Sequence, residues 1–239
     1  MPLYGYIVLR CKEMIMCGRF ALNQISDSIL ELLGFGLPES FQERFNIAPS
    51  ENSWVALQEK DRKPVLQELY WGLIPFWAKE KSIGMSAINA RAESVAEKPM
   101  FREAYQRRRC LVPASGFYEW RKNGKGKIPY YFSPKNEEEP LVFAGLWENW
   151  NNGNETLRSF TIITTAANDF MKPIHDRMPL ILKPEFWQKW LAPATALSEL
   201  EKILERPVDN GFLQNWEVDS YVNDISHEGS FCAEPVNLF

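Results

Sequence analysis

Short runs of hydrophobic and polar residues dominate the middle of the chain and predict a β-rich fold. Between residues 110 and 166, runs rich in β-branched and aromatic residues alternate with glycine, asparagine and charged residues, as is typical of short strands and turns. These runs are "CLVP", "GFYEWRK", "IPYYFS", "LVFAGLW" and "FTIITTA". We expect further strands at "CGRFAL", at "SWVALQE" and "PVLQELYWG", which flank the charged turn "KDRK" as a hairpin, and at "NWEVDSYV" and "AEPVNL".

Four other segments predict helices. "SDSILELLGFG" offers Ser26 as N-cap and Gly34 or Gly36 beyond its end, and "KPMFREAYQRR" places Pro99 at an N1-like position. "PEFWQKWL" and "ATALSELEKIL" predict surface helices. Because the helices do not follow each strand in turn, βαβ repeats are disfavoured. The pattern predicts an α+β fold: a single domain with a mixed, largely antiparallel, barrel-like sheet and peripheral helices.

Composition supports a compact protein and disfavours a membrane or secreted one. Of the 239 residues, 45% are hydrophobic and 13% aromatic, more than a disordered chain carries. No apolar run approaches the roughly 18 residues that a membrane helix needs. In residues 1–16 a short apolar stretch is followed by Arg10, Lys12 and Glu13, where a signal peptide would have small residues. We expect a cytoplasmic protein without contact to membranes.

Cysteine and histidine usage argues against a disulfide framework and against a metal site. The four cysteines are scattered without a C-x-x-C pair, and the chain has only two histidines. They are Cys11, Cys17, Cys110 and Cys232. We therefore expect no metal and no organic cofactor.

The charge is distributed unevenly. The formal net charge of -4 argues at first against a nucleic-acid partner. However, residues 98–127 contain nine Lys/Arg and two Glu, a net of +7, whereas residues 185–239 contain ten Asp/Glu and three Lys/Arg, a net of -7. This asymmetry fits either an ordinary solvated surface or a molecule with one basic and one acidic face.

Four short motifs carry side chains that could do chemistry. "MCGRF", "INARAES", "SGFYEW" and "IHDRMP" contribute Cys17, Asn89, Glu119 and His175. Such a set can activate a thiol, orient a carbonyl or hemiacetal and shuttle a proton. Each residue also has an ordinary structural explanation. Cys17 could be a small core residue, Asn89 a turn former, and Glu119 the solvent-facing residue of a strand.

Taken together and in this order, the motifs resemble the SRAP family (SOS response-associated peptidase), whose members shield abasic sites in single-stranded DNA. "RFNIAP" (residues 44–49) and "WGLIPFWA" (residues 71–78) add to the resemblance, which runs from Cys17 to about Val236. It implies one SRAP-like domain over residues 17–239. Residues 1–16 are then an N-terminal extension that we do not expect in the mature active protein.

The resemblance also implies a mechanism. In the family the initiator Met is removed, and the amine and thiol of the exposed Cys condense with the aldehyde of an opened abasic sugar to give a thiazolidine. By resemblance, Glu119 assists the chemistry at Cys17, His175 exchanges a proton with the deoxyribose oxygen, and Asn89 hydrogen-bonds the opened sugar. An α-amine suits this reaction, because near neutrality it is unprotonated more often than a lysine by a factor of order 10².

Several further residues are expected to bind DNA. The arginines each follow a candidate site residue by two positions, where a strand-like period would put them on the same side and allow them to fork to phosphates. Exposed aromatic and proline side chains could stack on bases or wedge at a junction of single and double strand, although core packing is the alternative for the aromatics. The expected DNA-binding residues are Arg19, Asn46, Pro49, Phe76, Trp77, Arg91 and Arg177. Phosphate contacts predict weak sequence preference and strong salt dependence.

Two other functions remain open at this point. In a thiol hydrolase or peptidase, Cys17 would be the nucleophile and His175 the base, oriented by Asn89 or Glu119. A single-strand binding module without catalysis would use only the arginines and aromatics. The written sequence also puts the Cys17 nitrogen in a peptide bond to Met16, where its lone pair is delocalised and cannot attack an aldehyde. The thiazolidine mechanism thus requires translation from Met16 or later cleavage of the leader, including cleavage by the protein's own site.

Overall fold

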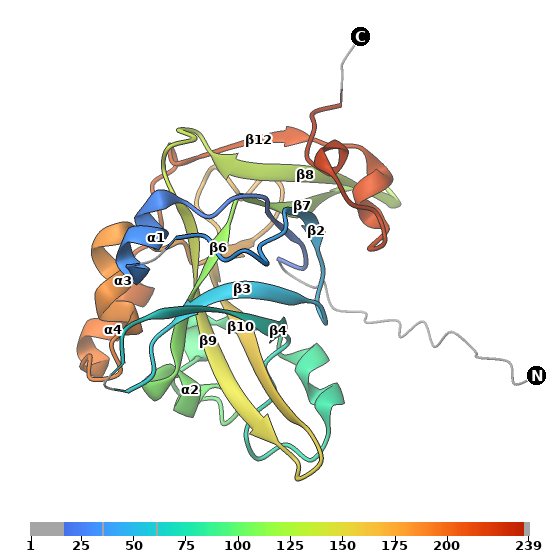
Figure 1. The fold of residues 1–239 in the computed structure, drawn as a ribbon. Helices are drawn as coiled ribbons and strands as arrows, with labels where there is room; N and C mark the ends of the chain where they lie inside the picture. Colours follow the sequence, from blue (N-terminus) through green and yellow to red (C-terminus); the bar gives the residue numbers. More distant parts are fainter. Residues whose placement is uncertain (1–16, 35, 61, 237–239) are drawn as a thin grey trace, which may run out of the picture.

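The computed structural model describes residues 17–34, 36–60 and 62–236, so the prediction for residues 1–16 lies outside the described residues. Figure 1 shows the arrangement of the elements. The strands are β1 (Phe20–Leu22), β2 (Arg44–Ile47), β3 (Asn52–Leu57), β4 (Val65–Trp71), β5 (Asn89–Arg91), β6 (Arg109–Ala114), β7 (Gly116–Asn123), β8 (Gly126–Pro134), β9 (Leu141–Asn151), β10 (Thr156–Ala166), β11 (Arg177–Pro179) and β12 (Leu213–Glu217). The α-helices are α1 (Asp27–Leu33), α2 (Arg102–Arg107), α3 (Pro184–Leu191) and α4 (Leu197–Leu204), and the 3₁₀ helices are η1 (Lys81–Ser86), η2 (Ala92–Ser94), η3 (Ser220–Asn223) and η4 (Ser230–Cys232).

Five strands close into a small barrel. β10 pairs in parallel with β4, and antiparallel pairs β4–β3, β3–β6, β6–β9 and β9–β10 complete the ring. β5 and β11 attach to β10, the first in parallel and the second antiparallel. The prediction of a mixed, largely antiparallel, barrel-like sheet in an α+β domain is confirmed. Closure removes the strand edges that an open sheet of this size would expose.

A second, antiparallel sheet lies against the barrel in the order β12-β8-β7-β1-β2, with β12 and β8 at the top of Figure 1. Phe20 of β1 joins the two sheets, because its ring contacts Trp71 edge-on at 5.1 Å and Phe143 at 6.2 Å between centroids. All three side chains are fully buried. Burial of aromatic rings this large contributes on the order of 2–3 kcal/mol each, so this junction is a main anchor of the short β1 strand.

Most of the elements predicted from the sequence are present. β3 and β4, on either side of "KDRK", pair in antiparallel register, and the five central runs form β6 to β10. At α1, Ser26 occupies the N-cap position without a side-chain capping bond, and Gly34 ends the helix with a φ of 72°. The left-handed backbone there favours glycine because a Cβ would be strained.

Three local predictions were wrong. The α2 helix begins at Arg102, and Pro99 precedes it in a turn in which the Lys98 carbonyl accepts from later backbone N–H groups. The strand predicted from "NWEVDSYV" ends at Glu217, and its second half forms η3. The segment "AEPVNL" is not a strand within its described part and contributes one isolated bridge, from Pro235 to Val218. A proline has no N–H with which to extend a β ladder.

None of the helices in the described part of the chain is long and apolar enough to span a membrane.

Candidate active site and nucleic-acid interface

The backbone nitrogen of Cys17 and the carboxylate of Glu119 form the centre of the site. β1 pairs with β7 through Phe20 and Phe117, and the Arg19 carbonyl accepts from the Tyr118 N–H, so the residues just before β1 lie beside β7. The Cys17 N–H donates to Glu119 Oε1 at 2.7 Å. The fold therefore brings together two residues that are 102 positions apart in the sequence.

Glu119 and Cys17 are almost completely removed from solvent. Cys17 is 0% and Glu119 is 2% exposed. Glu119 is therefore not the solvent-facing residue of its strand, which was the structural explanation that the sequence offered for it. Burial raises the pKa of Glu119 to about 8, opposed in part by the N–H that Cys17 donates. Burial, and secondarily the charge of Glu119, raises the pKa of the Cys17 thiol. Both groups therefore favour their neutral, protonated forms at pH 7.

Cys17 also has an unusual backbone conformation. Its φ of 36° lies in the left-handed region that residues with a Cβ rarely adopt, and such strain costs on the order of 1–3 kcal/mol. The predicted strand-like period from Cys17 to Arg19 does not hold, because β1 begins only at Phe20.

Asn89 lies next to the Cys17 backbone. It is the first residue of β5, where it pairs with Ile162 of β10. Its Nδ2 donates to the Cys17 carbonyl at 3.5 Å, at the upper limit for a hydrogen bond. The structure thus places Cys17, Asn89 and Glu119 together, as the sequence motifs predicted.

His175 is buried immediately before β11, with 7% exposure. The Arg177 N–H donates to its Nδ1 at 3.0 Å, and the Asp176 carboxylate lies 3.1 Å from the same nitrogen. Burial lowers the pKa of His175, and Asp176 only partly opposes this. The lowered pKa favours the neutral ring at pH 7, and its Nε2 has no hydrogen-bond partner within the described ranges.

The segment of His175 lies beside the segment of Asn89, because β11 and β5 both pair with the same end of β10 and Arg177 binds Glu93. Asp176 raises and Lys127 lowers the pKa of Glu119, and the same two side chains shift the pKa of His175 in the same directions. The same charged side chains therefore act on both groups. The four predicted catalytic residues thus belong to one region of the molecule.

The three predicted arginines differ in availability. Arg19 is 9% exposed and donates to Asn46 Oδ1 at 2.8 Å and to the Val222 carbonyl at 3.0 Å, and burial lowers its pKa. Arg177 is held by both carboxylate oxygens of Glu93, at 2.5 and 2.9 Å. Arg91 is exposed at the end of β5.

Asn46 is fully buried, and its amide is used inside the protein. It donates to three backbone carbonyls of the C-terminal segment, those of Val222, Asp224 and His227, at 2.8 to 3.3 Å. Asn46 therefore has no surface in this structure with which to touch DNA directly. It fixes the C-terminal segment beside Arg19.

An exposed apolar edge lies in the loop after β4. Phe76 is 51% and Trp77 is 49% exposed, so the core-packing alternative does not apply to these two rings. Met85 is 55% exposed, and its sulfur accepts a hydrogen bond from the Ser50 hydroxyl. Ser50 directly follows Pro49, which is half-buried. Sequence reasoning did not single out Met85, Glu93 or Lys127. Only Lys127, in the "RKNGKGK" stretch, left a visible signal in the charge pattern.

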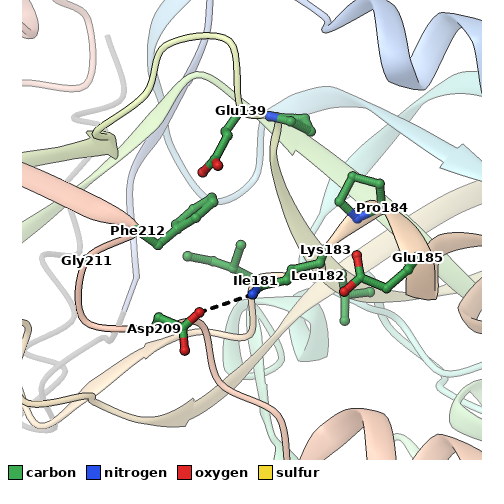
Figure 2. A pocket seen from close by; sticks show the side chains of 10 residues that line it. Glu139, Ile181, Leu182, Lys183, Pro184, Glu185, Asp209, Gly211 and Phe212 are labelled. Atoms are coloured by element: carbon green, nitrogen blue, oxygen red, sulfur yellow. Dashed lines mark hydrogen bonds and ion pairs between the residues drawn. The ribbon is translucent and has the colours of Figure 1, made fainter.

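A pocket of about 470 Å³ lies elsewhere and contains none of the predicted site residues. Figure 2 shows the Lys183–Asp209 ion pair at its edge and the Phe212 ring in its wall. Among the described residues there is no group of three or more His, Cys, Asp or Glu side chains that could hold a metal ion. The pocket is lined by Glu139, Lys183, Glu185 and Asp209 but by no cysteine or histidine of the described ranges, so the predicted thiol chemistry belongs to the region around Cys17.

The comparison with known proteins agrees with the motif order. Residues 16–225 match the family model described as SOS response associated peptidase (SRAP). The chain is 42% identical over 214 residues to the abasic site processing protein YoqW of Bacillus subtilis, covering 87% of this chain and 94% of the relative. It is 29% identical over 229 residues to the abasic site processing protein YedK of Escherichia coli, covering 92% and 100%.

Solved structures show the same architecture. A crystal structure of a protein from Bacteroides thetaiotaomicron superposes with a TM-score of 0.81 at 26% identity, covering 92% of this chain and all of that one. A phage-related protein from Bordetella bronchiseptica superposes at 0.69 with 29% identity, covering 86% of this chain and 95% of the other. With the family model matched over most of its length, the chain belongs to the SOS response associated peptidase (SRAP) family.

Proposed function

We propose that this protein processes abasic sites in single-stranded DNA, including those at junctions with double strand, by forming a covalent DNA–protein cross-link through Cys17 as the first residue of the mature chain. The relatives named as abasic site processing proteins support the substrate. The observation that carries the chemistry is the 2.7 Å hydrogen bond from the Cys17 nitrogen to Glu119.

Removal of residues 1–16 would turn this amide nitrogen into an α-amine beside the same carboxylate. An α-ammonium titrates at about 7.7 to 8.0, close to the pKa of about 8 that burial gives Glu119. A proton can then pass from the ammonium to the carboxylate at little cost, which leaves the amine free to attack. Once the ammonium is present, its charge will also lower the pKa of Glu119, so the two groups titrate as a pair.

The reaction balances without a cofactor. The amine adds to the aldehyde carbon of the opened deoxyribose, and the aldehyde oxygen leaves as water to give an imine. The Cys17 thiol then adds to the imine carbon, and its proton ends on the ring nitrogen. Glu119 carries the protons between these steps, and the neutral His175 exchanges one with the sugar oxygen through Nε2. Asn89 would hydrogen-bond the opened sugar.

A second activity has its own observation in support: release of the leader by hydrolysis of the Met16–Cys17 peptide bond. The leaving nitrogen is that of Cys17, which is hydrogen-bonded to Glu119. Because its raised pKa keeps Glu119 protonated near neutrality, Glu119 can act as the general acid. The positive φ of Cys17 strains the residue on the leaving side of that bond. Water adds to the Met16 carbonyl, the C–N bond breaks, and the amine takes the proton.

The test compares three proteins: the 239-residue chain, a chain that begins at Cys17, and the latter with Cys17→Ser. Each is incubated with a single-stranded oligonucleotide carrying one abasic site and with the undamaged oligonucleotide. We expect a denaturant-stable adduct on damaged DNA for the chain beginning at Cys17, and for the 239-residue chain only to the extent that it has released its leader. The intact mass of the adduct should be the sum of the two partners minus one water.

Acetylation of the α-amine separates the alternatives. It should abolish the adduct, whereas a thiol hydrolase would keep its activity. If no adduct forms with a free Cys17, and Cys17→Ser leaves DNA capture unchanged, the protein is a binding module instead. Intact mass spectrometry of the 239-residue chain during incubation at neutral pH tests leader release, with Glu119→Gln as the variant expected to retain the leader.

A further inference from the structure

The β7–β8 hairpin carries positive charge that no ion pair within the described ranges neutralises. Arg121, Lys122, Lys125 and Lys127 are all exposed, and none of them forms a salt bridge to a described residue. The guanidinium of Arg121 lies over the Tyr130 ring at 4.9 Å. The hairpin tip is therefore a concentrated cationic surface.

The pairing register makes this concentration unfavourable for the protein alone. Lys122 lies directly opposite Lys127 in the antiparallel ladder. Like charges at directly opposed positions destabilise a sheet. A polyanion that covers the tip would remove this repulsion, so the arrangement suits a phosphate backbone better than it suits the free protein.

The same hairpin reaches into the chemistry of the site. β7 carries Glu119, and strand alternation puts Arg121 on the same face of β7 as Glu119. The ammonium of Lys127 lowers the pKa of both Glu119 and His175. By the same alternation Lys122 and its partner Lys127 lie on the other face of the hairpin, so a strand bound at the tip would lie beside the region around Cys17.

Of the other basic groups near the site, Arg91 is exposed, whereas the remaining ones are less available. Arg19 is committed to Asn46 and Val222, and the charge of Arg177 is neutralised by Glu93. Elsewhere in the basic stretch, Arg109 is 1% exposed and bonds only backbone carbonyls among the described residues. Strong salt dependence requires free cations at the site, and the hairpin has them.

We infer that the tip of the β7–β8 hairpin is a binding site for the phosphate backbone of the single-stranded DNA, with Lys122, Lys125 and Lys127 as its main phosphate contacts. This inference rests on the proposed function for its ligand. Each lysine that neutralises one phosphate contributes a slope of about -0.7 to the plot of log K against log salt concentration on single strands.

The test uses two variants with the same change of net charge in the chain beginning at Cys17. The hairpin variant is Lys122→Gln, Lys125→Gln and Lys127→Gln. The control is Lys98→Gln, Arg102→Gln and Arg107→Gln, three exposed residues of the same basic stretch. Arg102 and Arg107 belong to α2, which lies low in the view of Figure 1, whereas β8 lies at the top.

Binding of an undamaged single-stranded oligonucleotide is measured by fluorescence anisotropy from 0.05 to 0.5 M salt. We expect the hairpin variant to lose about 2 units of slope and roughly tenfold or more in affinity at 0.1 M salt, with the control unchanged. The melting temperature of the hairpin variant should not fall, because a like-charge pair is removed. Equal loss in both variants, or loss in neither, overturns the inference.

Cross-linking to an abasic oligonucleotide is scored separately on the parent chain. A hairpin-specific loss of slope without any parent adduct would reject the cross-linking function and keep the hairpin site. A parent adduct with equal slopes for the parent and both variants would keep the function and reject the hairpin site.

Discussion

The centre around Cys17 and the rim around it use opposite physical means. Cys17, Glu119 and His175 are buried, and desolvation is the largest cause of each pKa shift there. At the rim, Trp77 is half exposed and Arg91 is exposed, so both side chains can be reached from solvent. For the proposed function, burial would tune proton transfer at the centre, whereas exposure would leave the rim free to meet a large, charged ligand. Variants at the centre should change rates, and variants at the rim should change affinity.

The largest effect is expected from Glu119→Gln in the chain that begins at Cys17. Without a proton acceptor beside the amine, the cross-linking rate at saturating abasic DNA should fall by about 10²-fold or more. The parent rate should rise with pH until the pair formed by Glu119 and the amine has lost its proton, and the variant should lose the contribution of Glu119 to this profile. Quenched time courses on denaturing gels from pH 6 to 9 measure both.

Glu148→Gln is the matched control for this comparison, since Glu148 is also a buried glutamate, 3% exposed, whose pKa is raised by burial. It pairs with Arg108 on the barrel and not with Cys17. Its rate should equal that of the parent even where its stability falls. An equal loss of rate in both variants would show that the effect is not specific to the centre.

The next largest effect is expected on the free energy of unfolding of the 239-residue chain, which should depend on pH. The folded pKa of Glu119, about 8, is above its ordinary value, so the folded state holds a proton that the unfolded state releases. The stability that this proton contributes is fully present below about pH 4.5 and is lost as the pH rises through about 8. The free energy of unfolding should fall by on the order of a few kcal/mol over this range. Urea unfolding at pH 5 and pH 8.5 measures the decline.

Glu119→Gln should flatten that decline, and so should exposure of the Cys17 amine, because an adjacent ammonium stabilises the carboxylate. Identical pH profiles for the 239-residue chain and the Glu119→Gln variant would mean that Glu119 is not protonated in the folded protein. That result would remove the physical basis for its role as general acid in leader release.

At the rim, Trp77→Ala should weaken binding of single-stranded DNA by about 1–3 kcal/mol, the usual value of one base stacked on an aromatic ring. The melting temperature should stay close to that of the parent because the ring is half exposed. Leu197→Ala on α4, 46% exposed, is the control and should leave the affinity unchanged. A fall in stability without a change in affinity would assign Trp77 to packing.

The smallest effect separates two arginines of the rim. Arg91→Gln should reduce the salt slope of single-strand binding by about 0.7, whereas Arg177→Gln should leave it unchanged, because Glu93 already neutralises Arg177. Arg177→Gln should instead lower the melting temperature and slow cross-linking through the displaced His175. Equal slope losses in both variants would indicate that Arg177 leaves Glu93 for a phosphate.

Local patterns were sufficient for most of the fold. The runs that form β6 to β10 combine β-branched and aromatic residues with turn residues at their ends. The hairpin of β3 and β4 pairs two strands that are neighbours in the sequence, so a local pattern is enough to predict it. The C-terminal segment escaped prediction because its structure depends on distant partners. Asn46 and the bridge from Val218 to Pro235 hold it, and no local periodicity encodes either contact.

The site was predicted less completely than the fold. Glu119 breaks the rule of alternation because both faces of its strand are covered: Phe117 packs into the main core, and Tyr118 packs into a second cluster with Val218 and Val222. Period-two patterning identifies a solvent face only where one face of the sheet is open. The availability of Arg19, Asn46 and Arg177 was equally invisible, because their partners come from remote segments.

By itself the sequence determined the residue types for the chemistry, their order along the chain and the strands that carry them, because these follow from local composition and periodicity. It also raised the problem of Cys17, whose nitrogen is acylated as written. Only the tertiary structure decided that this nitrogen meets Glu119, that the carboxyl is desolvated, and which cations stay free. Burial and long-range contact depend on the packing of segments about a hundred residues apart, and no local pattern records that packing.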